Sequence, residues 1–284
     1  MRRWLHFFAW RYIRGNITVA ESGCIAVSIG EVWSVTVVEV AILVCAFFAV
    51  ATLYTTVGHA GASGYLATMA IVGVAPEVMR PTALALNVLV AAITVYRFRR
   101  ARYFSWTALW PFLLGSVPLA AFGGAMRLPP GTYYAVVGAV LLASAAMLVW
   151  RVYGSGFRRD DAGISVNRTL AVPIGAVIGL VSGLTGTGGG IFLSPILLLL
   201  RWSGPKTTAG IAAPFILVNS AVALVAGSVS AGTLPVELPW LAAAAVAGTM
   251  VGTWLGLSKL SQRGLVTTLA VVMVVAGGKL LATA

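Results

Sequence analysis

Charged residues are scarce in this chain. Of its 284 residues, 9% are charged and only 7 are Asp or Glu, whereas 60% are hydrophobic and the mean hydropathy is +0.97. A soluble domain usually carries about 25% charged residues. One soluble core cannot hide this much apolar surface, so most of the chain must face lipid or other buried helices. The composition therefore predicts an all-α, polytopic membrane protein.

Cysteine and histidine are almost absent, with two residues each. Cys24 and Cys45 offer neither a metal-ligand spacing nor a disulfide framework, and Cys45 is most simply a small packing residue in an apolar stretch. A membrane enzyme would need a cluster of His, Cys, Asp or Glu at membrane depth, and the sequence offers only His59 and Glu39. We therefore expect no catalytic residues, no metal and no cofactor.

The net charge of +12 is the one feature that suggests nucleic acid. However, the basic residues lie in short loops between apolar stretches, which is typical of positive-inside membrane topology and not of a DNA-binding face. No nucleic-acid partner is expected. Residues 1–32 form a separate basic and aromatic segment, in which Arg11 and Arg14 interrupt any signal-peptide core. They predict either an interfacial helix or a disordered tail.

Ten apolar stretches follow this segment. A spanning helix needs about 20 apolar residues, because each adds 1.5 Å across a core of about 30 Å. Seven stretches are predicted as long helices: Trp33–Val57, Pro81–Tyr96 with Pro81 in its first turn, Phe104–Gly124, Thr132–Trp150, Ile211–Gly227, Leu238–Leu257 and Leu265–Thr283. Three are too short to cross alone: Gly64–Val74, Leu170–Leu184 and Gly190–Leu200.

Two glycine-rich breaks precede the short stretches Gly64–Val74 and Gly190–Leu200. The second break lies within Gly183–Pro195, read GLTGTGGGIFLSP, and the first is Gly58–Ser63. Glycine weakens a helix by roughly 1 kcal/mol relative to alanine, so both places should interrupt the helix. A broken backbone at membrane depth is tolerated only where protein buries it or a wet cavity lines it. Such breaks are the best sequence indication of a transporter's binding site.

The two halves of the chain resemble each other, each with a break, a short arm, a Pro-containing turn, an Asn-bearing helix and two further helices. We predict a first membrane repeat over 33–152, a linker over 153–169 and a second repeat over 170–284. Loops 97–102, 151–168, 201–206 and 259–263 hold twelve of the nineteen Lys and Arg. Placing these loops in the cytoplasm gives the halves opposite senses, which predicts an inverted 5+5 repeat with two short, broken hairpins.

The breaks predict an anion site. Two short helices would begin at depth with free backbone N–H groups and positive dipole ends, and glycine lets a ligand approach the backbone closely. Hydroxyls and the amides of two neighbouring helices would add donors. The candidate substrate-binding residues are Gly58, His59, Gly61, Ser63, Gly64, Asn87, Thr185, Gly186, Gly188, Gly189, Gly190 and Asn219, and the candidates for proton coupling are His59 and Glu39.

Each of these residues also has a purely structural interpretation. Glycines are frequent at tight helix crossings, and Asn87 or Asn219 alone often forms an interhelical hydrogen bond. His59 can be a neutral residue that fixes the loop, and Glu39 can lie near the membrane interface. Arg80 and Lys206 are most simply loop anchors. Matching breaks in both halves favour a site.

Three segments carry a resemblance to a known family: GHAGASGYL at 58–66, PEVMRPTALALN at 76–87 and GLVSGLTGTGGGIFLSP at 179–195. They resemble the TauE/SafE family, the sulfite exporter-like or 4-toluene sulfonate uptake permeases. The first-half motif departs from the second, with His59, Ala60, Ala62 and Ser63 in place of further glycines, and residues 1–32 are additional.

The resemblance implies a multi-pass protein of the bacterial inner membrane, in contact with lipid, that transports small sulfur oxyanions or organosulfonates. Its implied partners are an anionic organosulfur substrate and a coupling ion such as the proton. We interpret the chain as a permease that works by alternating access. A passive anion channel is the nearest alternative, and a non-transporting membrane subunit is a further one. Direction, substrate identity, coupling ion and oligomeric state stay open.

Overall fold

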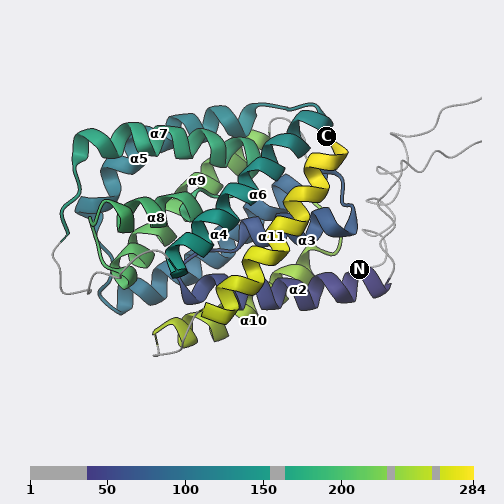
Figure 1. Cartoon of the computed structure of the whole chain (residues 1–284), viewed down its shortest axis with the longest axis horizontal. Helices are drawn as coiled ribbons and strands as arrows, with labels where there is room; N and C mark the ends of the chain where they lie inside the picture. The colour runs from purple at the N-terminus through teal and green to yellow at the C-terminus, as the bar shows by residue number, and fades with distance from the viewer. Residues whose placement is uncertain (1–36, 154–163, 229–233, 258–262) are drawn as a thin grey trace, which may run out of the picture. The chain divides into compact units, whose positions relative to one another are not determined.

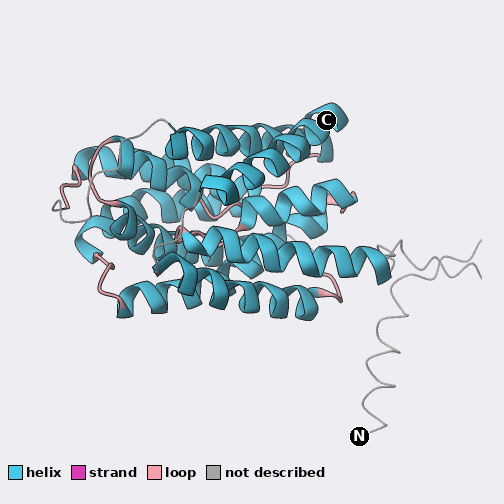
Figure 2. Cartoon of the chain, turned by 60° about the horizontal axis from the view of Figure 1, so that its bottom comes forward, coloured by secondary structure: helices cyan, strands magenta, loops and turns pink. Residues whose placement is uncertain are grey.

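The computed structural model describes residues 37–153, 164–228, 234–257 and 263–284. Within these ranges the chain is helical, and Figure 2 shows helices joined by loops without a strand in the described parts. This confirms the predicted all-α class. The helices are α2 (Val37–Thr56), α3 (Ala62–Val72), α4 (Pro76–Arg100), α5 (Trp106–Ala125), α6 (Pro130–Tyr153), α7 (Arg168–Thr185), α8 (Gly190–Leu199), α9 (Pro205–Ser228), α10 (Leu238–Leu257) and α11 (Arg263–Thr283).

Seven of the described helices are long and apolar enough to cross a membrane, namely α2, α4, α5, α6, α7, α9 and α10. They identify a multi-pass membrane protein. By contrast, α3 has 11 residues and α8 has 10, so each covers roughly half of a 30 Å hydrocarbon core. Figure 1 shows these two short helices towards opposite ends of the bundle, α8 on the left and α3 on the right.

Two helices start well before the predicted residue. Helix α4 begins at Pro76, so Pro81 is its sixth residue and lies inside the helix. Pro76 occupies a first-turn position, where no N–H is needed, and Glu77 adds an acid that the helix dipole favours there. Helix α9 likewise begins at Pro205 and not at Ile211. An apolar stretch marks the lipid-facing part of a helix, whereas the helix itself extends into polar flanks.

Helix α7 is also longer than the predicted Leu170–Leu184. The Asn167 side chain caps its start by accepting hydrogen bonds from the N–H groups of Thr169 (3.1 Å) and Leu170 (3.4 Å). The resulting 18-residue helix is long enough to span. The hairpins of both halves therefore pair one long arm, α2 or α7, with one short arm, α3 or α8.

The helix packing keeps its pattern when the two halves are exchanged. Helix α5 packs on α7, and its counterpart α10 packs on α2; α3 contacts α11, and its counterpart α8 contacts α6. Helix α5 also packs on α9, and its counterpart α10 packs on α4, while two further contacts join counterparts directly, α4 with α9 and α6 with α11. Residues Val40–Ala284 form one compact unit that includes both halves. The opposite orientation of the halves stays a prediction, as do the proposed repeat boundaries.

Glycine ridges hold two of these helix pairs close together. Gly175, Gly179 and Gly183 recur every four residues along α7, and a Cβ on any of them would overlap a backbone carbonyl of α5. Gly248, Gly252 and Gly256 do the same on α10 against carbonyls of α2. Small residues allow such backbone approach between helices in a membrane. These glycines therefore match the packing interpretation, which distinguishes them from the glycines in the breaks.

The basic loops gather at one end of the helices. Lys206 lies 5.5 Å from the Tyr103 ring, and Arg168 lies 5.7 Å from the Trp110 ring at the start of α5. Ser165 N–H donates to the Trp202 carbonyl at 3.1 Å, which joins the end of the linker to the α8–α9 loop. Residues 1–32, residues 154–163 and most of 259–263 lie outside the described residues, as does Cys24.

Cys45 differs from its predicted role. Its side chain is exposed on α2 and does not pack in the interior. In a membrane protein, an exposed position on an apolar helix is a lipid-facing position, where a small, weakly polar thiol is tolerated.

Candidate functional site

The two breaks are turns made by glycine. Gly58 and Gly61 have φ of +80° and +96°, and Gly186, Gly188 and Gly189 have φ of +85°, +77° and +77°. Other residues rarely adopt this left-handed region. The turns reverse the chain between each long arm and its short arm, so the glycines are needed for the hairpins to form.

Both breaks are buried. His59 is 2% exposed in the first, and Thr187 is 5% exposed in the second. The short helices α3 and α8 begin there with Gly61 and Gly189 as their N-caps, and neither N-cap supplies a side-chain hydrogen bond. The first N–H groups of a helix have no partner within the helix. Each break therefore directs backbone donors and a positive dipole end into the protein interior.

A hydrogen bond joins the two breaks. His59 Nε2 lies 2.7 Å from Ser194 Oγ in α8. A Cβ placed on Gly190, the first residue of α8, would lie 3.6 Å from the His59 ring and would overlap Ile216 of α9. The breaks, 130 residues apart in the chain, thus meet in the interior, with α9 against both.

Side chains fix the first break. The Tyr54 hydroxyl is 2.8 Å from Ser63 Oγ and donates to Met273 Sδ of α11 at 3.1 Å. Gly64 faces α2, where a Cβ would press against Val50 and Tyr54. Of the predicted ligand residues in this half, Ser63 and Gly64 are therefore engaged in packing the hairpin together.

In the second break, local contacts hold the hydroxyls. Thr185 Oγ1 donates to the Val181 carbonyl at 2.7 Å and lies 3.0 Å from Thr187 Oγ1. The backbone glycines meet neighbouring helices instead: Gly186 lies against Arg80 of α4, and Gly189 lies against Ile178 and Phe215. The backbone of the second break thus contacts side chains of α4 and α9.

Asn87 and Gly188 are in direct contact. Asn87 Nδ2 donates to Ser220 Oγ at 3.2 Å, and a Cβ on Gly188 would come within 2.5 Å of Asn87 Nδ2 and 2.9 Å of Ser220 Oγ. Asn219 is directed differently, because its Nδ2 donates to the Phe215 carbonyl at 2.9 Å on its own helix. Its Oδ1 is buried without a hydrogen-bond partner in the described structure. Asn219 therefore offers an acceptor, where the sequence suggested an amide donor.

Two cations at the end opposite the basic loops, Arg80 and Lys279, cap helices. Arg80 donates to the carbonyls of Gly123, Gly124 and Met126 at the end of α5, and Lys279 Nζ donates to the carbonyls of Ala70 and Ile71 at 2.9 Å at the end of α3. Positive charge is favourable at a helix C-terminus. Arg80 is therefore an anchor, as predicted.

Glu39 is far along its helix from the first break. It lies in the first turn of α2, and the break follows the last residue of that helix, Thr56. Seventeen residues at 1.5 Å each separate Glu39 from Thr56 by about 25 Å. Of the two proton-coupling candidates, only His59 is at the junction of the breaks.

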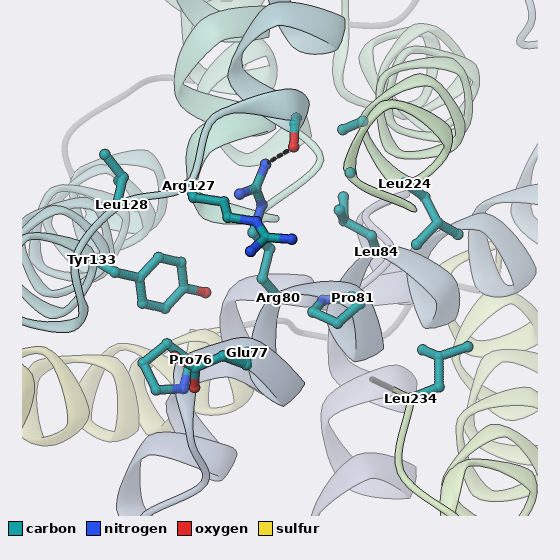
Figure 3. A pocket seen from close by; sticks show the side chains of 13 residues that line it. Pro76, Glu77, Arg80, Pro81, Leu84, Arg127, Leu128, Tyr133, Leu224 and Leu234 are labelled. Atoms are coloured by element: carbon teal, nitrogen blue, oxygen red, sulfur yellow. Dashed lines mark hydrogen bonds between the residues drawn. The ribbon is translucent and has the colours of Figure 1, made fainter. Parts of the chain in front are cut away.

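A cavity of about 390 Å³ lies beside the second break (Figure 3). It is lined by Arg80 and Arg127, by Glu77 and Tyr133, and by apolar side chains from α4 and α9. The Tyr133 hydroxyl donates to the Thr185 carbonyl at 3.2 Å, so a wall of the cavity is bonded to the last residue of α7.

Sequence reasoning missed several residues that build this region: Tyr54, Ser194, Ser220, Tyr133 and Arg127. Ser194 was the easiest to find, because it is a polar residue in an apolar arm directly after the glycine motif. The others lie on elements distant in sequence, and only the packing brings them to the breaks.

Comparison with known proteins adds the family. The model of the sulfite exporter TauE/SafE family matches residues 42–280, which include both breaks and all of the residues that line the cavity. The chain belongs to the TauE/SafE family. This TauE/SafE protein is also 40% identical over 243 residues to the "Probable membrane transporter protein y4hK" of Sinorhizobium fredii (strain NBRC 101917 / NGR234), which covers 84% of this chain and 97% of the relative. No solved structure matches this chain.

The family and this relative identify a multi-pass membrane transporter, which in a bacterium resides in the inner membrane. The resemblance seen in the three sequence motifs is thereby confirmed.

Proposed function

We propose that this TauE/SafE protein is a secondary transporter of small sulfur-containing anions, sulfite or organosulfonates, and that it works by alternating access around the two breaks. The observation that carries the proposal is the contact between the breaks, made by the 2.7 Å pair of His59 and Ser194. The ends of two short helices meet there, each with a glycine N-cap.

The chemistry of this junction suits an anion. Backbone N–H groups and dipoles at helix N-termini attract negative charge without a buried cation, and a low dielectric strengthens that attraction. The family model, described as a sulfite exporter, supports a sulfur oxyanion as the ligand. Backbone N–H groups from two helix starts would suit an ion with several oxygens.

The arrangement of the hairpins supports alternating access. Helices α3 and α8 lie towards opposite ends of the bundle (Figure 1), and each follows its own glycine turn. Movement of one hairpin relative to the other would open the junction to one end and then to the other. Because the His59–Ser194 contact joins the hairpins, His59 is our candidate for coupling this movement to a proton.

The test is a matched pair of glycine substitutions. Gly188→Ala places a Cβ within 2.5 Å of Asn87 Nδ2 at a φ of +77°, whereas Gly73→Ala introduces an equally left-handed alanine, at +88°, with nothing within 4 Å. We expect Gly188→Ala to lower sulfite or sulfonate counterflow in proteoliposomes by more than about tenfold, the effect of roughly 1.4 kcal/mol or more on binding.

Gly73→Ala should keep most of the counterflow, because it carries the same backbone strain away from the junction. Equal counterflow in the two variants would contradict the site. If the unchanged protein takes up substrate, but substrate on the opposite side of the membrane does not accelerate that uptake, the protein is a passive channel.

A further inference from the structure

The cavity beside the second break is lined by two arginines that differ in their hydrogen bonds. Arg80 is committed to the carbonyls at the end of α5. Arg127, on the α5–α6 loop, is exposed and has no hydrogen bond or ion pair with the part of the chain that the structure describes. Figure 3 shows Arg127 directed into the same space as Arg80 and the Tyr133 hydroxyl. Only Arg127 is thus available to a ligand.

The rest of the cavity is largely apolar. Leu84 and Pro81 of α4 and Leu224 of α9 line it, together with Leu128 and Leu234. A volume of about 390 Å³ is within the range of pockets that hold organic ligands, roughly 300–1,000 Å³, and is far more than a lone oxyanion needs. The charged lining residues sum to +1, from two arginines and Glu77.

We propose that this cavity binds an organic monoanion with an apolar body, whose anionic oxygens pair with Arg127 and whose body rests on the leucines. A guanidinium matches the oxygens of a sulfonate or carboxylate through two parallel hydrogen bonds. The leucine walls favour binding because they remove the apolar surface of the body from water.

The cavity's position makes it an antechamber to the second break. Arg80 is in contact with Gly186, and Tyr133 is bonded to the Thr185 carbonyl, so these two side chains lie between the cavity and the glycines. This part of the inference rests on the proposed function, because it assigns the cavity to the path of the transported anion. A size-selective antechamber would favour organic sulfonates over sulfite.

The binding test uses benzenesulfonate, methanesulfonate and neutral benzenesulfonamide on the full-length protein in an uncharged detergent, measured by calorimetry. We expect benzenesulfonate to bind tightest, because it combines the charge with the apolar body. Arg127→Gln should weaken its binding by about tenfold, as expected for the loss of a charge-assisted pair. Arg127→Lys should fall between, because it keeps the charge without the planar fork.

Arg100→Gln is the matched control, since it removes the same charge at the other end of α4, where Arg100 contacts Tyr96. It should leave benzenesulfonate binding unchanged. Equal weakening by Arg100→Gln and Arg127→Gln, or equal binding of benzenesulfonamide and benzenesulfonate, would overturn the assignment.

The same variants separate this inference from the proposed function. If Arg127→Gln leaves benzenesulfonate binding intact while sulfite counterflow persists, the antechamber fails and the transport proposal stands. If binding depends on Arg127 but the unchanged protein transports neither sulfite nor sulfonate, the site stands and the transport proposal fails.

Discussion

Both breaks form a turn between a long helix and a short one, but different contacts hold the two turns. The first break is fixed by side chains, through the Tyr54–Ser63 pair and the contact of Tyr54 with Met273, and its Gly58 abuts the backbone of Ala209 on α9. The second break has three left-handed glycines, and Gly188 meets only the tips of side chains. A first break that is held by side chains and contains His59 thus faces a second break that presents mainly backbone. Under the proposed function, we expect coupling at the first break and ligand contact at the second.

The largest effect should come from Gly58→Ala. Its Cβ would overlap the Ala209 backbone, which cannot rotate away as a side-chain tip can, and φ is +80°. We expect a loss of about 3 kcal/mol or more of stability from overpacking and left-handed strain together. Thermal unfolding in detergent should show a larger Tm drop than for Gly188→Ala or the open-space control Gly73→Ala. A smaller drop than for Gly188→Ala would show that the first break is the more adaptable one.

An intermediate and more specific effect is expected from His59→Gln. Glutamine keeps a polar group beside Ser194 Oγ but cannot take up a proton between pH 5 and 8. We expect substrate counterflow to persist while accumulation driven by an imposed pH gradient is lost. Ser194→Ala serves as the control, because it removes the hydrogen bond and leaves the imidazole. Retained pH-driven accumulation in His59→Gln would remove the proton-coupling role from the first break.

The smallest effect should come from Tyr54→Phe. It removes one hydroxyl from the first break and leaves Ser63 Oγ without the 2.8 Å partner. The expected cost is about 1–2 kcal/mol, the usual penalty for a buried polar group that loses its hydrogen bond. Thermal unfolding measures it against Tyr96→Phe, whose ring is 64% exposed. Equal stability of the two variants would mean that side chains do not hold the first break.

Long apolar stretches made the membrane class predictable, because lipid requires them in nearly uninterrupted form. The predicted Leu238–Leu257 coincides with α10, and Gly190–Leu200 ends one residue after α8. The predicted starts of α4 and α9 were misplaced because Pro76 and Pro205 lie in polar flanks, where hydropathy is low and gives no sign of a helix. Breaks were found because a run of glycines at membrane depth has few uses other than a turn.

The sequence by itself determined that this protein is helical, membrane-spanning and interrupted twice by glycine, because composition and glycine spacing act locally along the chain. Tertiary structure alone decided which side chains meet. Ser194 reaches His59 across 135 positions, Asn87 donates to Ser220 on a distant helix, and Arg80 caps the end of α5 while Arg127 lines the cavity without such a bond in the described structure. Such choices depend on how helices distant in sequence pack, and no local pattern encodes them.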